Sequence, residues 1–190
     1  MSSVRVATTH GQLVGRLRAN QLGLWFFIAS ESFLFAAVIS ARYYVLGVER
    51  PEELNQPLGF AISVVLLLSS LTAYRAEIAM GHDDRRRFFR NVRTTIGLGL
   101  LFLVGVGLEW QEGLRFFPPR TLYGSVFFTL VGLHAFHVFT GLVGLAVVTD
   151  MARRGRFGSQ DLWPVEGVVK YWHFVDVAWV FIFPTLYLVS

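Results

Sequence analysis

The chain contains no cysteine, and it is poor in charged residues. The absence of cysteine from its 190 residues excludes disulfides, thiolate metal sites and redox-active thiols. Charged residues make up only 16% of the sequence, whereas a soluble domain has about a quarter. Hydrophobic residues account for 54%, and the mean hydropathy is +0.51. This composition leaves little polar surface for water and predicts an integral membrane protein.

The common enzyme motifs are also absent. There is no glycine-rich phosphate loop ending in lysine and serine or threonine, no His-Glu-x-x-His and no nucleophile elbow. No separate apolar core precedes the first long apolar run, so we expect the first helix to act as its own insertion signal. Sequence motifs therefore predict no catalytic residue in this chain.

The net charge of +4 raises the question of nucleic acid binding. Sixteen of the seventeen basic residues are arginine, and they lie in short clusters between apolar runs. This arrangement is typical of the cytoplasmic loops of membrane proteins rather than of a groove-binding surface. We therefore expect membrane lipids, and no nucleic acid, as partners.

Five apolar stretches approach the roughly 20 residues that a helix needs to cross a bilayer. After a tail of residues 1–20, they run approximately over 21–46, 58–79, 92–108, 122–149 and 168–189. The segments that join them are short and polar or contain proline, so no extramembrane domain is expected. The predicted fold is all-α, a single membrane domain made of a bundle of five transmembrane helices.

The basic residues are distributed unevenly among the joining segments. Thirteen of the seventeen fall in the tail, the second and the fourth joining regions, and only four fall in the other two. The positive-inside rule places the richer side in the cytoplasm. The sequence thus predicts a cytoplasmic N-terminus and, after five crossings, a C-terminus outside.

Two carboxyl groups are predicted at the same depth in the membrane. Glu31 lies ten residues into the first span and Asp176 eight residues into the fifth, both from the cytoplasmic side. Each reaches roughly 12 to 15 Å into a hydrocarbon core about 30 Å thick. A structural interpretation has each carboxyl protonated or accepting hydrogen bonds from neighbouring helices, and we favour it for Asp176. For Glu31, a proton-exchanging role is an equal alternative.

Three histidines lie in the same apolar stretches. His134 and His137 are three residues apart, on one face of the fourth predicted helix, and His173 enters with the fifth. Two histidines so placed cannot ligate a haem from opposite sides. A metal site of His134, His137 and Glu31 stays open on spacing alone, but we favour buried histidines that hydrogen-bond between helices.

Two further features lie at the membrane surfaces. Glu109 followed by Trp110, at the outer end of the third span, predicts an interfacial anchor with its carboxylate near the headgroups. The basic run 85–87 is expected at the inner surface, where such clusters commonly meet anionic lipid. Within the fourth span, Thr140 and Gly144 form a small-xxx-small pair that allows close helix packing.

Several motifs in one order resemble subunit III of the haem-copper cytochrome c oxidases. The most specific is Tyr171-Trp172-His173-Phe174-Val175-Asp176-Val177-x-Trp179. Matches that precede it are Ser30-Glu31-x-x-x-Phe35, Glu109-Trp110, Tyr123-Gly124-Ser125-x-Phe127-Phe128 and Gly132-x-His134-x-x-His137-Val138. The resemblance extends from Leu22 onward. Many members have two additional helices before this point, so the chain is similar to the five-helix bacterial form.

The resemblance implies a non-catalytic subunit of a proton-pumping terminal oxidase that reduces oxygen to water in the bacterial cytoplasmic membrane. Haem and copper are then expected in partner subunits and no metal in this chain, with direct packing on subunit I. Subunit II and small subunits are further expected partners, and bound phospholipid is expected. The implied roles are support of proton uptake, lipid binding and stability of subunit I.

The resemblance also implies roles for particular residues. Glu31 corresponds to the family's carbodiimide-reactive carboxylate. Arg153, Arg154 and Arg156 fall where members of the family bind a lipid headgroup. His134, His137, His173, Asp176 and Glu109 are then expected to be structural polar groups within the membrane.

Two alternative functions are also compatible with the sequence. An accessory subunit of a nitric oxide reductase would share much of the same sequence pattern. A free-standing proton or ion transporter built on Glu31, Asp176 and His137 would need inverted repeats or broken helices, and neither is visible in the sequence. The electron donor, cytochrome c or quinol, is not indicated by this chain.

Overall fold

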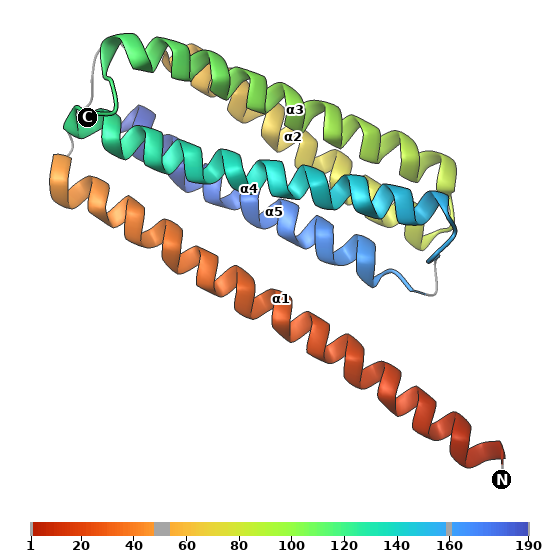
Figure 1. Cartoon of the computed structure of the whole chain (residues 1–190). Coiled ribbons are helices and arrows are strands. Elements are labelled where there is room, and N and C mark those ends of the chain that lie inside the picture. The colour runs from red at the N-terminus through yellow and green to blue at the C-terminus, as the bar shows by residue number, and fades with distance from the viewer. Residues whose placement is uncertain (1, 48–53, 159–160, 190) are drawn as a thin grey trace.

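A computed structural model describes residues 2–47, 54–158 and 161–189, and all regular secondary structure in these ranges is helical (Figure 1). The elements in chain order are α1 (Ser2–Leu46), α2 (Gln56–Gly81), α3 (Arg85–Phe116), α4 (Leu122–Arg153), α5 (Trp163–Phe183) and the π-helical turn η1 (Pro184–Leu188). The all-α fold class is confirmed. Each of the first four predicted spans lies inside one helix, whereas the fifth continues from α5 into η1.

Four helices are long and apolar enough to cross a membrane: residues Gly15–Leu46 of α1, and the whole of α2, α3 and α4. α5 differs because it carries Glu166, Lys170 and Asp176 within its 21 residues. The chain is therefore a multi-pass membrane protein. The stability of α5 in a membrane therefore depends most on the hydrogen-bond partners that the neighbouring helices provide for its polar side chains.

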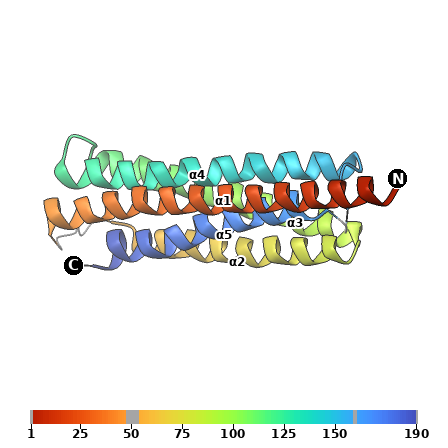
Figure 2. The same ribbon diagram turned by 90° about the horizontal axis from the view of Figure 1, so that it is seen from below.

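The helices run nearly parallel or antiparallel to one another, and α1 stands at the edge of the assembly (Figures 1 and 2). The closest packing is between α2 and α3, and α4 and α5 complete a four-helix group. α1 contacts α4 and α5, while its N-terminal half lies apart from the other helices in Figure 1. Most of α1 therefore presents its apolar side chains outward.

The two chain ends lie at opposite ends of the assembly (Figure 1). The α2–α3 turn and the α4–α5 connection lie at the same end as the N-terminus, and Arg85 Nη1 donates a 3.3 Å hydrogen bond to the carbonyl of Ala152 there. Both arginine-rich segments, 85–93 and 153–156, thus gather at one end. This is the arrangement on which the predicted orientation depends.

Side-chain caps begin three of the helices. Asn55 Oδ1 accepts from the backbone N–H of Leu58 at 3.1 Å, and Asp84 Oδ1 accepts from that of Arg87 at 2.9 Å. Thr121 caps α4 in the same way. Each cap satisfies an N–H group that has no partner within its helix. At the other end of the chain, Pro184 has no N–H to donate, and the helical turn widens to the π form there.

Trp172 is the centre of the helix packing and is fully buried. Its indole lies in a slot between two glycines, Gly99 of α3 and Gly141 of α4. A Cβ atom built on Gly99 would lie 2.7 Å from Trp172 Cη2, and one on Gly141 would lie 2.8 Å from Trp172 Cε3. Small residues are what allow helices to approach this closely in lipid. The predicted pair behaves similarly, since Thr140 and Gly144 both face α5.

We predict that Gly99→Ala destabilises the protein by about 1–3 kcal/mol, because the added methyl must displace the buried indole of Trp172 or the side chain of Leu142. Gly97→Ala is the matched control, since no other side chain lies within 4 Å of its Cβ position. Both changes raise helix propensity equally. Unfolding of the full chain in detergent micelles measures the difference, and equal stabilities would contradict the proposed slot.

Candidate functional site

Glu31 of α1 and His137 of α4 form a pair across the interface between the peripheral helix and the bundle. The distance between Glu31 Oε2 and His137 Nε2 is 3.1 Å. The side chain of His137 is 5% exposed and that of Glu31 is 21% exposed. Sequence reasoning predicted the depth of Glu31 and the burial of His137, but it did not predict that the two residues are direct partners.

The second nitrogen of the His137 ring fixes how a proton is shared in this pair. His137 Nδ1 lies 2.7 Å from the carbonyl oxygen of Leu133, which can only accept, so Nδ1 carries a hydrogen. A hydrogen bond between Nε2 and the carboxyl then requires one further proton between these two groups. With that proton on either atom the pair has no net charge, as a neutral acid beside imidazole or as carboxylate beside imidazolium.

Aromatic and hydroxyl groups surround the pair. The ring of Phe35 lies 5.0 Å from that of His137, centroid to centroid. One turn further along α4 toward its C-terminal end, Thr140 Oγ1 and the Tyr171 hydroxyl are 2.7 Å apart, and both also lie within hydrogen-bonding distance of the His137 carbonyl. Thr140, Tyr171 and the Glu31–His137 pair line a cavity of about 440 Å³ that opens between α1, α4 and α5. The pair therefore borders a space that a small molecule can enter.

His134 does not join this pair. It is fully buried, and its ring lies 4.8 Å from that of Trp179 and 5.6 Å from that of Phe102. We expected it to hydrogen-bond between helices, but within the described residues neither ring nitrogen has a hydrogen-bond partner. Over the same ranges, no three His, Asp or Glu side chains are grouped closely enough to hold a metal ion.

A row of serines on α2 receives the polar side chains of α5. Trp179 Nε1 donates to Ser63 Oγ at 2.7 Å, and Trp172 Nε1 donates to Ser69 Oγ at 3.0 Å. His173 Nδ1 lies 2.5 Å from the hydroxyl of the next serine, Ser70. Sequence reasoning missed these serines. The recurrence of small residues along one face of α2 is a signal that could have found them.

Asp176 and Glu109 are both buried, each less than 5% exposed. The Asp176 carboxyl lies beside Ser70 but outside hydrogen-bonding geometry. Glu109 Oε2 accepts a 2.8 Å hydrogen bond from the hydroxyl of Tyr187, which is itself fully buried. The Glu109 side chain therefore points into the bundle, toward the phenol donor that η1 brings there, while its depth relative to the headgroups stays a prediction.

The three arginines suggested as headgroup ligands lie together at the end of α4. Arg153, Arg154 and Arg156 are all exposed. Arg154 pairs with Asp150 one turn earlier, at 2.8 Å between Nε and Oδ2. This leaves Arg153 and Arg156 as the two of the three without an ion pair among the described residues.

Comparison with known proteins decides the family. The family model described as "Cytochrome c oxidase subunit III" matches residues 3–190. The chain belongs to this family. A cytochrome c oxidase subunit 3 of Bacillus sp. is 36% identical over 185 residues, covering 89% of this chain and 85% of the relative. That of Corynebacterium diphtheriae is 33% identical over 174 residues, covering 85% and 84%.

Longer members of the subunit III family also match. The subunit 3 of Gadus morhua is 32% identical over 177 residues, which are 87% of this chain and only 67% of that protein. The resemblance inferred from the motif between Tyr171 and Trp179 is thereby confirmed. Membership gives the chain its general role, that of an oxidase subunit in a membrane.

We predict that Glu31 and His137 stabilise the fold jointly. A double-mutant cycle with Glu31→Leu and His137→Leu should give a coupling energy of about 0.6–1.7 kcal/mol, the range of hydrogen bonds between membrane helices. Unfolding in micelles of the wild type, both single variants and the double variant provides the four values. A second cycle with Glu31→Leu and His173→Leu is the control, because His173 bonds Ser70 instead. Coupling of equal size in both cycles would contradict a direct pair.

Proposed function

We propose that this chain is a non-catalytic subunit of a bacterial haem-copper terminal oxidase and that it supports proton uptake by subunit I. In this proposal haem and copper reside in the partner subunits, and oxygen is reduced there. The observation that carries the proposal is the pairing of Glu31 with His137 beside an accessible cavity. Family membership supplies the oxidase context.

The pair has the chemistry of a proton-exchanging group. Its one shared proton can lie on Nε2 or on the carboxyl, and a second proton can be accepted to give imidazolium beside a neutral acid. Release of that proton restores the uncharged pair. The Nδ1–H bond to the Leu133 carbonyl holds the ring in one orientation throughout, so only the Glu31 side of the imidazole changes.

The outward faces of α1 are the surface that we assign to packing against subunit I and lipid. Trp25, Phe26 and Phe33 are each more than half exposed. In an aqueous protein such a surface would be unstable, and in the membrane it requires apolar neighbours. We place the N-terminus in the cytoplasm, which the gathering of both arginine-rich segments at that end supports.

Bound phospholipid is part of the same proposal. Arg153 and Arg156 are exposed at the end that we place in the cytoplasm, where an anionic headgroup can meet them. The Gly155 residue between them has φ +65°, which turns the chain sharply after α4 and keeps both arginines close to the helix end.

We expect a tagged copy of the chain to co-purify from its native membranes with a haem-bearing subunit, seen as a haem absorbance spectrum of the complex. The same chain produced alone should show no haem absorbance, because the described residues contain no pair of histidines set on opposite sides of a haem. Stoichiometric haem on the isolated chain, or a tagged complex free of haem, would refute the assignment.

For Glu31→Gln in the assembled complex, we expect oxygen consumption to fall by less than about tenfold, whereas loss of a catalytic base costs about 10²–10⁴-fold. The deficit should grow from mildly acidic to alkaline pH, because protons become scarcer. Glu112→Gln is the control, since its hydrogen bond with Asn55 can be kept by the amide. A deficit that is independent of pH would contradict the role in proton uptake.

A further inference from the structure

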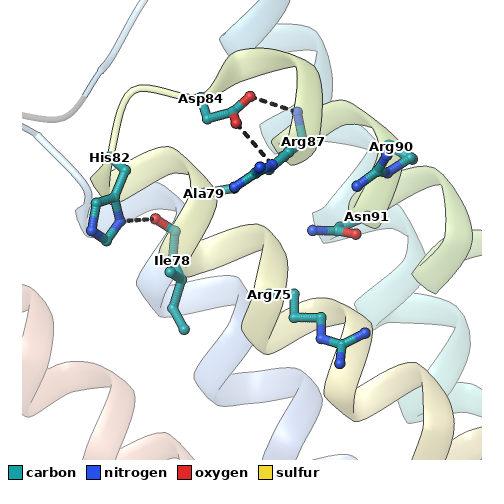
Figure 3. A pocket seen from close by; sticks show the side chains of 8 residues that line it. All are labelled: Arg75, Ile78, Ala79, His82, Asp84, Arg87, Arg90 and Asn91. Carbon is teal, nitrogen blue, oxygen red and sulfur yellow. Dashed lines mark hydrogen bonds and ion pairs between the residues drawn. The ribbon is translucent and has the colours of Figure 1, made fainter.

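A second polar site lies between the last turns of α2 and the first turns of α3. It shares no residue with the Glu31–His137 pair or with the cavity beside that pair. It is a cavity of about 580 Å³ whose polar lining consists of Arg75, His82, Asp84, Arg87, Arg90 and Asn91. Figure 3 shows the α3 side chains directed toward α2, with Arg75 on the α2 side of the same space. No residue of α4 or of the 153–156 arginines takes part in it.

The charges in this pocket do not cancel. Arg87 is neutralised by Asp84, whose Oδ2 lies 3.1 Å from Arg87 Nε. Arg75 and Arg90 form no salt bridge within the described residues, so the pocket carries two uncompensated guanidinium charges. The Asn91 side chain also makes no hydrogen bond within the described residues, so its amide is available as a donor.

These donors suit a phosphate group. A guanidinium offers parallel N–H groups that match two phosphate oxygens, and arginine is the side chain most used for such recognition. His82 Nδ1 is already occupied by the carbonyl of Ile78 at 2.9 Å, so that nitrogen is not part of the binding set. Arg75, Arg90 and Asn91 remain as three donors from two helices around one space.

The surface beside the pocket indicates where the phosphate comes from. Counting back from Arg75 along one face of α2, the side chains of Leu71, Leu67, Val64 and Phe60 form an exposed apolar stripe. A phosphate held by the arginines would therefore have a path for an acyl chain running along α2 toward the membrane centre. A soluble phosphate compound without an acyl chain would make no contact with this stripe.

We propose that the α2–α3 pocket binds a phosphate group and that its source is the headgroup of an anionic phospholipid. The arginines hold the phosphate at the membrane surface, and the Phe60–Leu71 stripe contacts the acyl chain. This site is separate from the arginines at the end of α4. It depends on the chain's place in a membrane and not on the proton-uptake role, so either can fail without the other.

The test uses the full chain in detergent micelles, with bound phosphatidylglycerol counted by native mass spectrometry. For the double variant Arg75→Gln/Arg90→Gln we expect phosphatidylglycerol to bind about 25-fold more weakly, from about fivefold for each arginine. The double variant Arg86→Gln/Arg93→Gln is the matched control, because it removes the same charge from exposed positions outside the pocket. It should change binding by no more than about twofold.

Competition with millimolar inorganic phosphate distinguishes the two sources of phosphate. Selective loss in the pocket variant, with no displacement by inorganic phosphate, supports the lipid site. Selective loss together with displacement supports the phosphate site and assigns it to a soluble ligand. Equal loss in both double variants, or no loss in either, overturns the proposal. Circular dichroism verifies the fold, and Arg90→Gln alone serves if the double variant does not fold.

Discussion

The structure depends on the hydrogen bonds that α2 offers to α5. Lipid provides no donors or acceptors, so each polar group on a membrane helix must find its partner in the protein or remain unpaired at considerable cost. Ser63 and Ser69 accept hydrogen bonds from the indoles of Trp179 and Trp172, and Ser70 bonds His173 of the same helix. Because serines are small, they also let the helices come close enough for Trp172 to enter its slot. Hydrogen bonding and close packing between α2 and α5 are therefore a single constraint, because both depend on the same small serine side chains.

This constraint divides the molecule into two parts with different properties. α2, α3, α4 and α5 share a core in which the largest side chains are fully buried. α1 is held chiefly by contacts of its C-terminal half, and the Glu31–His137 bond is the central polar one among them. Because the Glu31–His137 pair at this edge borders a cavity, the proton exchange that we propose can reach it without opening the core. A pair inside the α2–α5 seam could not be reached in this way.

The sequence was informative about the positions of the helices and about the family, and much less so about side-chain partners. Apolar runs of the right length located the helices, whereas the depth of Glu31 in the membrane stays a prediction. The identity of its partner depends on how α1 is rotated about its axis, which hydropathy does not record. The partner of Glu109 was not predicted for a similar reason, since its hydrogen-bond donor comes from η1, 78 residues later in the chain. The serines of α2 were overlooked because each alone is an ordinary residue in a membrane helix.

Charge in this protein is separated by depth, and the separation limits what each region can do. The arginines without ion pairs considered above, Arg75, Arg90, Arg153 and Arg156, lie near the end where both basic segments gather, and they suit permanent anions such as phosphate. At the predicted mid-membrane depth a permanent charge would be costly, and the proton exchange that we propose for Glu31 and His137 meets this limit, because an acid and a base that share one proton carry no net charge. In the functions that we propose, the helix ends bind anions and the middle of the bundle exchanges protons, and the same dielectric constraint accounts for both.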